Sequence, residues 1–113
     1  VLQTLLGTPY EPDLSGKILF IEEVSEKPYV IDRLLTHLLL SGNLADVKGL
    51  VFGDMHQCSD GRHDLEAVIT DCLRRLDCPI VTGFPAGHGP VNMAFRFGQM
   101  ARIDTALERL FLA

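Results

Sequence analysis

Apolar and polar positions divide the chain into runs typical of buried strands and faces typical of amphipathic helices. Residues 17–23 read KILFIEE, a continuous apolar run of strand length that ends in two carboxylates, and residues 49–53 and 79–82 form similar short runs. Continuous rather than alternating apolar residues favour strands that are covered on both faces. The sequence therefore predicts three buried strands over these ranges.

Two amphipathic helices are predicted between these strands. The first begins near Pro28, which suits a first helical turn, and stops at Gly42. The second follows Asp64, a predicted N-cap, and its last turn holds Arg74 and Arg75, whose charge suits the negative end of a helix. The apolar faces at helical spacing are Ile31, Leu34, Leu35, Leu38 and Leu39 in the first helix, and Leu65, Val68, Ile69, Cys72, Leu73 and Leu76 in the second.

The remaining segments are polar or rich in glycine and proline. Residues 54–62 are predicted as a polar loop and residues 83–90 as a glycine-rich loop, while 92–98 and 99–104 are expected to pair as short strands, and 105–113 form a weakly amphipathic tail. This order predicts one α/β domain with a partly parallel sheet and right-handed crossovers. In such sheets functional residues gather where strands end, so those ends hold the candidate chemistry.

Composition narrows the possible partners and compartment. The chain has 113 residues, 47% of them hydrophobic and 22% charged, with a net charge of −5. That acidic balance argues against nucleic acid and anionic membranes as partners, and no apolar run approaches the roughly 20 residues of a membrane span. Three cysteines without close pairing predict no disulfide framework and indicate a reducing compartment. The chain starts at Val1 without a signal-peptide pattern, as expected for one domain of a longer protein.

Glu22 and His88 are the main candidates for catalytic chemistry. Glu22 ends the first predicted strand, and strand alternation puts it on the face of Ile18 and Phe20, opposite Glu23. His88 lies between two glycines in the loop that follows the third strand. Each residue alone also fits a solvated strand end or an exposed loop histidine, but together they provide the base and the orienting carboxylate of a nucleophilic triad.

Neither a nucleophile nor a metal site is predicted within the chain. Residues 54–64 include His56, Cys58 and His63, but their spacing fits no zinc pattern, so a solvated loop is favoured. Cys58 is predicted to be exposed without a base partner, and Cys72 to lie in the core. No serine has the glycine-flanked setting of a nucleophile elbow; the four are Ser15, Ser25, Ser41 and Ser59.

Three segments, in this order and spacing, carry a family resemblance: GKILFIEEVSEKPYVIDRLLTHLLLSGNL, VKGLVFGD and PIVTGFPAGHGPVN. They resemble the C-terminal domain of the LD-carboxypeptidases, a serine peptidase family that also contains the microcin C immunity peptidases. The resemblance extends from about Gly7 to Asp104. It implies that residues 1–113 are the C-terminal domain of a two-domain enzyme, with a swivelling β/β/α-type fold, a mixed sheet and two main helices.

The resemblance also implies a Ser-His-Glu triad in which Glu22 and His88 are the catalytic glutamate and histidine. The serine would belong to an N-terminal domain that this chain lacks, so the chain alone is expected to be inactive. The implied reaction removes the terminal D-alanine from murein tetrapeptides by acyl transfer, in cytoplasmic peptidoglycan recycling and without metal or cofactor. Homodimers are implied for full-length members. Alternatives are a microcin-type peptidyl-nucleotide hydrolase of the same family and a non-catalytic binding domain.

The chain departs from the family pattern at residues 95–98. This stretch reads Phe95-Arg96-Phe97-Gly98, where the family usually has a proline before the glycine. Because Arg96 keeps its backbone N–H, local strand pairing is free to differ there.

Overall fold

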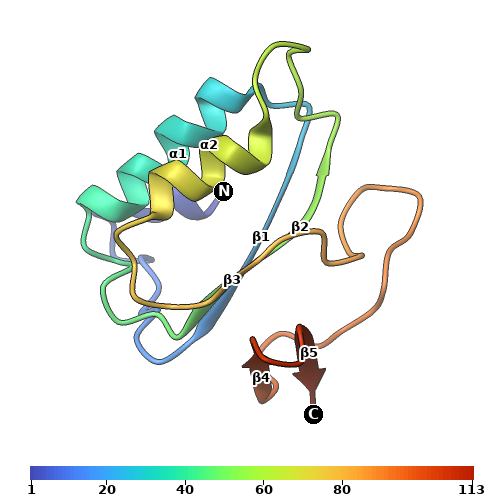
Figure 1. Ribbon diagram of the computed structural model, residues 1–113. Helices are drawn as coiled ribbons and strands as arrows, with labels where there is room; N and C mark the ends of the chain where they lie inside the picture. Colours follow the sequence, from blue (N-terminus) through green and yellow to red (C-terminus); the bar gives the residue numbers. More distant parts are fainter.

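A three-stranded parallel sheet lies between two unlike layers in the computed structural model, which describes residues 1–113 (Figure 1). The sheet consists of β1 (Ile18–Val24), β2 (Gly49–His56) and β3 (Ile80–Val81), in that order. Helices α1 (Pro28–Leu40) and α2 (Leu65–Leu73) cover one face, and the antiparallel hairpin of β4 (Ala101–Asp104) and β5 (Arg109–Leu112) lies on the other side. A short 3-10 helix, η1 (Leu2–Leu5), precedes the sheet. The predicted mixed α/β fold is confirmed.

The continuous apolar runs of the strands are explained by cover on both faces of the sheet. Leu19, Leu50 and Phe52 pack into the core that the helices close. Their neighbours Phe20 and Val51 belong to a second cluster on the hairpin side. The first five residues of β2 are fully buried because this strand is central, whereas β1 is half-buried throughout as an edge strand.

The predicted helix signals act as expected at three of the four helix ends. Pro28 begins α1, and Gly42, with φ of +78°, follows its end. The Asp64 side chain caps α2 by accepting the backbone N–H of Glu66 at 3.0 Å. The fourth end differs, because α2 stops at Leu73, so the two arginines predicted for its last turn lie beyond the helix. Neither α1 nor α2 has the length and apolar character of a membrane-spanning helix.

The predicted polar loop after the second strand begins later than expected. Asp54 and His56 belong to the end of β2, which pairs with β1 as far as Val24. Cys58, predicted to be exposed, is buried with 3% of its surface accessible, and this burial raises the pKa of its thiol. The longer strand was not predicted because hydrophobic periodicity does not detect a polar strand extension whose backbone continues the ladder.

The predicted pairing of residues 92–98 with 99–104 is wrong. Residues 92–98 form no strand, and β4 instead pairs with β5, in the segment predicted to be an amphipathic tail. The turn between them is stabilised by Asp104, whose side chain accepts the N–H of Leu107 at 3.0 Å, and Glu108 adopts a left-handed φ of +51°. Phe95 is instead used for packing, with its ring 4.9 Å from that of Phe20.

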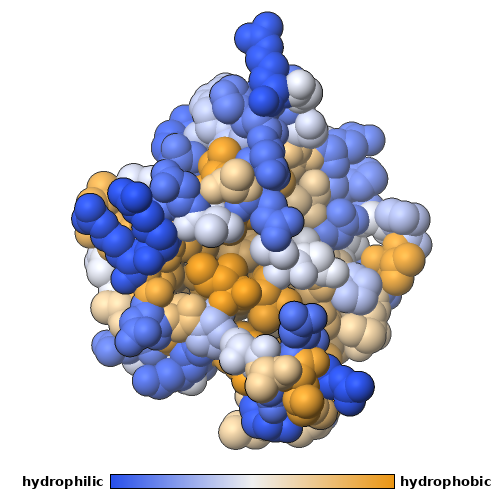
Figure 2. All heavy atoms as spheres, viewed as in Figure 1, coloured by the Kyte–Doolittle hydropathy of each residue, from blue (hydrophilic) through white to orange (hydrophobic).

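Aromatic side chains fill the space between the sheet and the hairpin. Phe84 meets Phe20 and Phe95 in edge-to-face contacts, with ring centroids 6.0 and 5.6 Å apart. Beside them lies an open, mostly apolar cavity of about 580 Å³. Hydrophobic atoms gather in the lower centre of Figure 2, and Phe97 and Met100 are 82% and 79% exposed. This layer is therefore less completely covered than the helical one.

A Phe→Ala substitution should lower the free energy of unfolding by different amounts in the two layers. Phe52→Ala removes a side chain that is 1% exposed, and we expect it to lower the free energy of unfolding by about 3–5 kcal/mol. Phe97→Ala truncates a ring that is 82% exposed, and we expect a change of about 0.5 kcal/mol or less. Urea unfolding followed by circular dichroism measures both; equal losses would contradict the assignment of the core to the helical side.

Candidate active site

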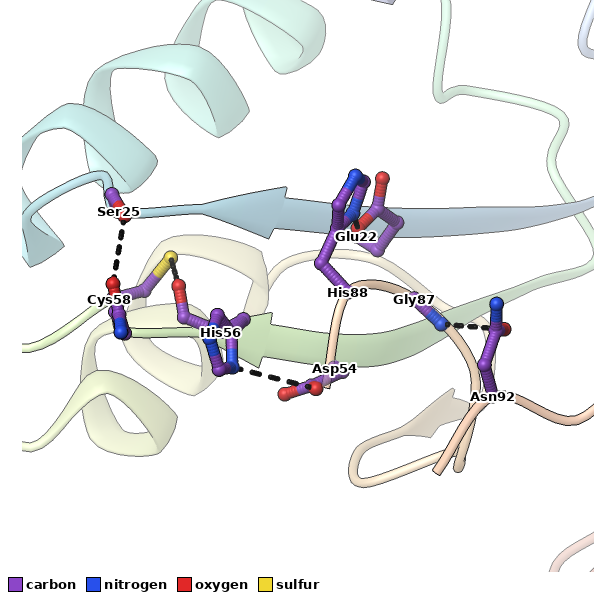
Figure 3. Close-up of polar contacts among 9 residues, drawn as sticks. Glu22, Ser25, Asp54, His56, Cys58, Gly87, His88 and Asn92 are labelled. Atoms are coloured by element: carbon purple, nitrogen blue, oxygen red, sulfur yellow. Dashed lines mark hydrogen bonds and ion pairs between the residues drawn. The ribbon is translucent and has the colours of Figure 1, made fainter. Parts of the chain in front are cut away.

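The side chains of Glu22 and His88 meet although 66 residues separate them in the chain. His88 Nδ1 lies 2.8 Å from Glu22 Oε2 (Figure 3). Glu22 comes from the end of β1, and His88 from residues 83–93, named here the histidine loop. The predicted proximity of the two side chains is confirmed.

The histidine loop reaches β1 because it continues the parallel pairing alongside β2. The N–H of Phe84 donates to the carbonyl of Phe52 at 3.0 Å, and the N–H of Asp54 donates to the carbonyl of Ala86 at 2.7 Å. These bonds follow directly on the two-residue strand β3. The loop is therefore fixed by backbone hydrogen bonds up to two residues before His88.

A register slip in the sheet makes room for the loop beside Glu22. Opposite this single residue of β1, strand β2 has two, Gly53 and Asp54. Such bulges change the direction of neighbouring side chains and are common beside active sites. Gly53 has no space for a side chain, since a Cβ there would overlap the Phe20 ring and the carbonyl oxygen of Ala86. The missing side chain lets the loop cross β2 in close contact.

The glycines on either side of His88 are also required by packing. Gly87 has φ of +136°, and a Cβ there would lie 3.1 Å from Asp54 and 3.2 Å from Glu22 Oε2. A Cβ at Gly89 would overlap the Asp54 carboxylate. The sequence pattern suggested free approach to a ligand; in the structure the glycines allow the loop to press against two carboxylates.

The geometry assigns a direction to the hydrogen bond between the pair. A carboxylate only accepts, so His88 Nδ1 donates and the neutral ring leaves Nε2 as an acceptor. No group of the chain is hydrogen-bonded to Nε2. The His88 side chain is 63% exposed and that of Glu22 28%. Exposed pairs contribute only about 0–1 kcal/mol to stability, so this contact orients the ring more than it holds the fold.

Two other histidines lie near carboxylates. His63 Nδ1 is 2.7 Å from Asp60 Oδ2, and Asp60 also accepts the N–H groups of His63 and Arg62 at 2.9 Å. These bonds, that of the His63 ring foremost, hold the pKa of Asp60 well below its usual value. All of these bonds lie within one exposed turn, residues 60–63. His56 Nδ1 is 3.9 Å from Asp54 Oδ2, beside the main pair.

No hydroxyl or thiol group of this chain is hydrogen-bonded to His88, whose side-chain partner is Glu22. The Ser25 hydroxyl bonds to Gln57 and that of Ser41 to a backbone carbonyl, while the Ser59 hydroxyl accepts the N–H of Gly61. Cys72, predicted as a core residue, is half-buried against that core. No three His, Cys, Asp or Glu side chains gather in a way that would hold a metal ion.

Sequence reasoning missed two residues that shape this site. Asp54 was assigned to a loop, whereas the bulge puts it against both glycines of the histidine loop. Asn92 ends the PIVTGFPAGHGPVN segment without a predicted role, and its Oδ1 accepts the N–H of Gly87 at 3.2 Å (Figure 3). Neither contact has a signal in hydrophobic spacing, because both depend on how an irregular loop folds back.

An open groove of about 410 Å³ adjoins the histidine loop. It lies between the end of β2, the start of α2 and the loop, and its lining includes Phe52, Asp54, Glu66 and Pro85. The groove gives an extended ligand room to lie beside the loop.

Comparison with known proteins agrees with this fold and gives its family. A family model described as the LD-carboxypeptidase C-terminal domain matches residues 1–103. The chain is 38% identical over 110 residues to the probable murein peptide carboxypeptidase of Bacillus subtilis, covering 94% of this chain and 34% of the relative. It is 29% identical over 101 residues to the murein tetrapeptide carboxypeptidase of Pseudomonas aeruginosa, covering 88% of this chain and 32% of that protein. It thus spans about a third of the length of these relatives.

Solved structures give the same result. The crystal structure of muramoyltetrapeptide carboxypeptidase from Oxalobacter formigenes superposes with a TM-score of 0.82 at 35% sequence identity, covering 98% of this chain and 40% of that one. The microcin C7 self-immunity protein MccF superposes with a TM-score of 0.66 at 24% identity, a likeness that shows the fold alone. On the family match and these identities, the chain belongs to the LD-carboxypeptidase family and corresponds to its C-terminal domain.

Proposed function

We propose that this chain supplies the glutamate and histidine of a Ser-His-Glu triad to a serine-type LD-carboxypeptidase. The contact of His88 Nδ1 with Glu22 Oε2, at the end of a parallel strand, is the observation that carries the proposal. The substrate is a murein tetrapeptide, from which the enzyme removes the terminal D-alanine. The relatives named as murein peptide and murein tetrapeptide carboxypeptidases support this substrate, and peptidoglycan recycling in the cytoplasm is the setting that it implies.

In this mechanism His88 transfers a proton twice. Its Nε2 takes the proton of a serine hydroxyl as the serine oxygen attacks the scissile carbonyl, and then returns it to the leaving amine of D-alanine. Water hydrolyses the acyl-enzyme by the same route in reverse. Glu22 keeps Nδ1 protonated, so Nε2 is the acceptor, and its negative charge stabilises the imidazolium that forms.

In this proposal the serine comes from outside this chain. The surface around His88 is where it would have to approach. His88 is exposed, and the aromatic layer with Phe97 and Met100 is incompletely covered. We therefore assign the nucleophile to an N-terminal domain that covers part of this surface. The chain alone then has a base and an orienting carboxylate but no alcohol to activate, so it should hydrolyse nothing at an enzymatic rate.

A chimera tests the triad assignment. This chain replaces the matching part of the Oxalobacter formigenes enzyme, and mass spectrometry follows release of D-alanine from an L,D-linked tetrapeptide. The chimera should turn over. His88→Ala should lower kcat by about 10⁴-fold or more, and Glu22→Gln by about 10⁴-fold, because each disables the base.

The matched control is His63→Ala, which removes the other histidine that is directly bonded to a carboxylate. It should leave kcat within about twofold, since surface substitutions away from a site have small effects. Full activity of the His88→Ala chimera would disprove the assignment. If the chimera hydrolysed a peptidyl nucleotide and not the tetrapeptide, the chain would be assigned to the microcin-type hydrolases of the family.

A second test observes the imidazole directly. Long-range proton–nitrogen spectra of this chain, at a pH where the ring is neutral, should show His88 protonated on Nδ1. Glu22→Ala removes the acceptor, and the ring should shift toward the Nε2-protonated form that predominates in free histidine. The His63 signals in the same spectra serve as an internal control. An Nε2-protonated ring in the unaltered chain would contradict the proposed role of Glu22.

The assignment of a covering domain predicts that the chain self-associates. An exposed apolar surface of this kind favours association in the isolated chain despite its net charge of −5. Light scattering over a concentration series should show a rising mean mass, and Phe97→Asp should reduce it by placing a charge on that surface. A strictly monomeric chain at millimolar concentration would argue against a covered face.

A further inference from the structure

We propose that Asn92 is a positioning residue that holds His88 against Glu22 through the backbone of Gly87. The Asn92 Oδ1 atom accepts the Gly87 N–H at 3.2 Å, as Figure 3 shows. Because a backbone amide only donates, the oxygen of the side-chain amide must face it. The consequence for catalysis rests on the proposed function; the consequence for the geometry of the loop does not.

Two hydrogen bonds close the histidine loop around its tip. Besides the bond from Gly87 to Asn92, the N–H of Met93 donates to the carbonyl of Pro85 at 2.8 Å. Together they join the two arms of the loop on either side of His88. The residue that carries the catalytic ring therefore lies at the end of a closed turn.

Asn92 holds the last fixed backbone point before His88. The Ala86 carbonyl is fixed to β2 by the N–H of Asp54 at 2.7 Å. The next residue, Gly87, has φ of +136°. Glycine can adopt this conformation, but many other backbone conformations are equally open to it. Beyond it, no backbone hydrogen bond involves His88 or Gly89. Without the Asn92 side chain, no hydrogen bond holds the backbone between the Ala86 carbonyl and His88, although the Met93–Pro85 bond still closes the base of the loop.

The position of Asn92 makes the effect local. Asn92 is exposed and contributes to no apolar cluster, so its loss should hardly change the free energy of unfolding. The hydrogen bonds of Phe84 and Ala86 to β2 do not involve it. We therefore expect truncation of Asn92 to shift the ring of His88 while the sheet and the base of the loop stay in place.

The spectra of His88 in this chain test the proposal without any enzyme assay. Asn92→Ala should lower the ratio of Nδ1- to Nε2-protonated ring about fivefold, the size of effect that one lost hydrogen bond produces. Asn92→Asp keeps an oxygen acceptor and should restore the ratio of the unaltered chain. The matched control is Asn43→Ala, which removes a side-chain amide bonded to Glu11 at 2.7 Å, in a contact unconnected with the histidine loop.

Activity of the chimera adds an independent readout. Asn92→Ala should lower kcat about fivefold and leave KM unchanged, because the ring is misplaced while the ligand surface is intact. An unchanged His88 tautomer in Asn92→Ala, or an equal change in Asn43→Ala, overturns the positioning role whether or not the chimera is active. A chimera that is inactive with Asn92 present contradicts the proposed function and leaves the spectroscopic result standing.

Discussion

The crossing of the histidine loop over β2 is the constraint on which the rest of the site depends. Parallel strands β1 and β2 are in register up to Ile21, and the extra residue of β2 then faces Glu22. Gly53 at this slip has no space for a Cβ, because the loop backbone and an aromatic ring already fill it. A side chain there would lift the loop from the sheet and separate His88 from Glu22. The 2.8 Å contact is thus a consequence of backbone packing more than of the attraction between the two groups.

The two layers that cover the sheet differ in packing, and the Glu22–His88 pair lies beside the less covered one. The helical layer provides most of the buried core, and the first five residues of β2 are buried because both faces of this strand are covered. The opposite layer is aromatic, open and shallow, and the exposed side chain of His88 shares the loop that contributes Phe84 to it. The buried core and the Glu22–His88 pair therefore lie largely on different faces of one sheet. This separation allows a site with exposed polar groups and closely packed glycines to sit on a well-packed support.

The sequence predicted the features that depend on local periodicity. The strands at 17–23 and 49–53, the helix from Pro28, the cap at Asp64 and the face of Glu22 all follow from spacing and backbone preference. Features that depend on tertiary pairing were missed: the polar end of β2, the burial of Cys58 and the β4–β5 hairpin. Residue types suggested combining Glu22 with His88, but spacing alone left each with a solvated alternative, and the family resemblance was needed to assign both to one triad. Asn92 required the folded loop itself.

The central claim is that Glu22 acts only through His88, and a double-variant cycle in the chimera tests it most directly. The account predicts that Glu22→Gln combined with His88→Ala lowers kcat about as much as His88→Ala alone, since a carboxylate that orients an imidazole has no role once the imidazole is gone. If the two losses instead multiply, so that the double variant falls by the product of the single effects, Glu22 and His88 work independently, and the triad assignment is contradicted.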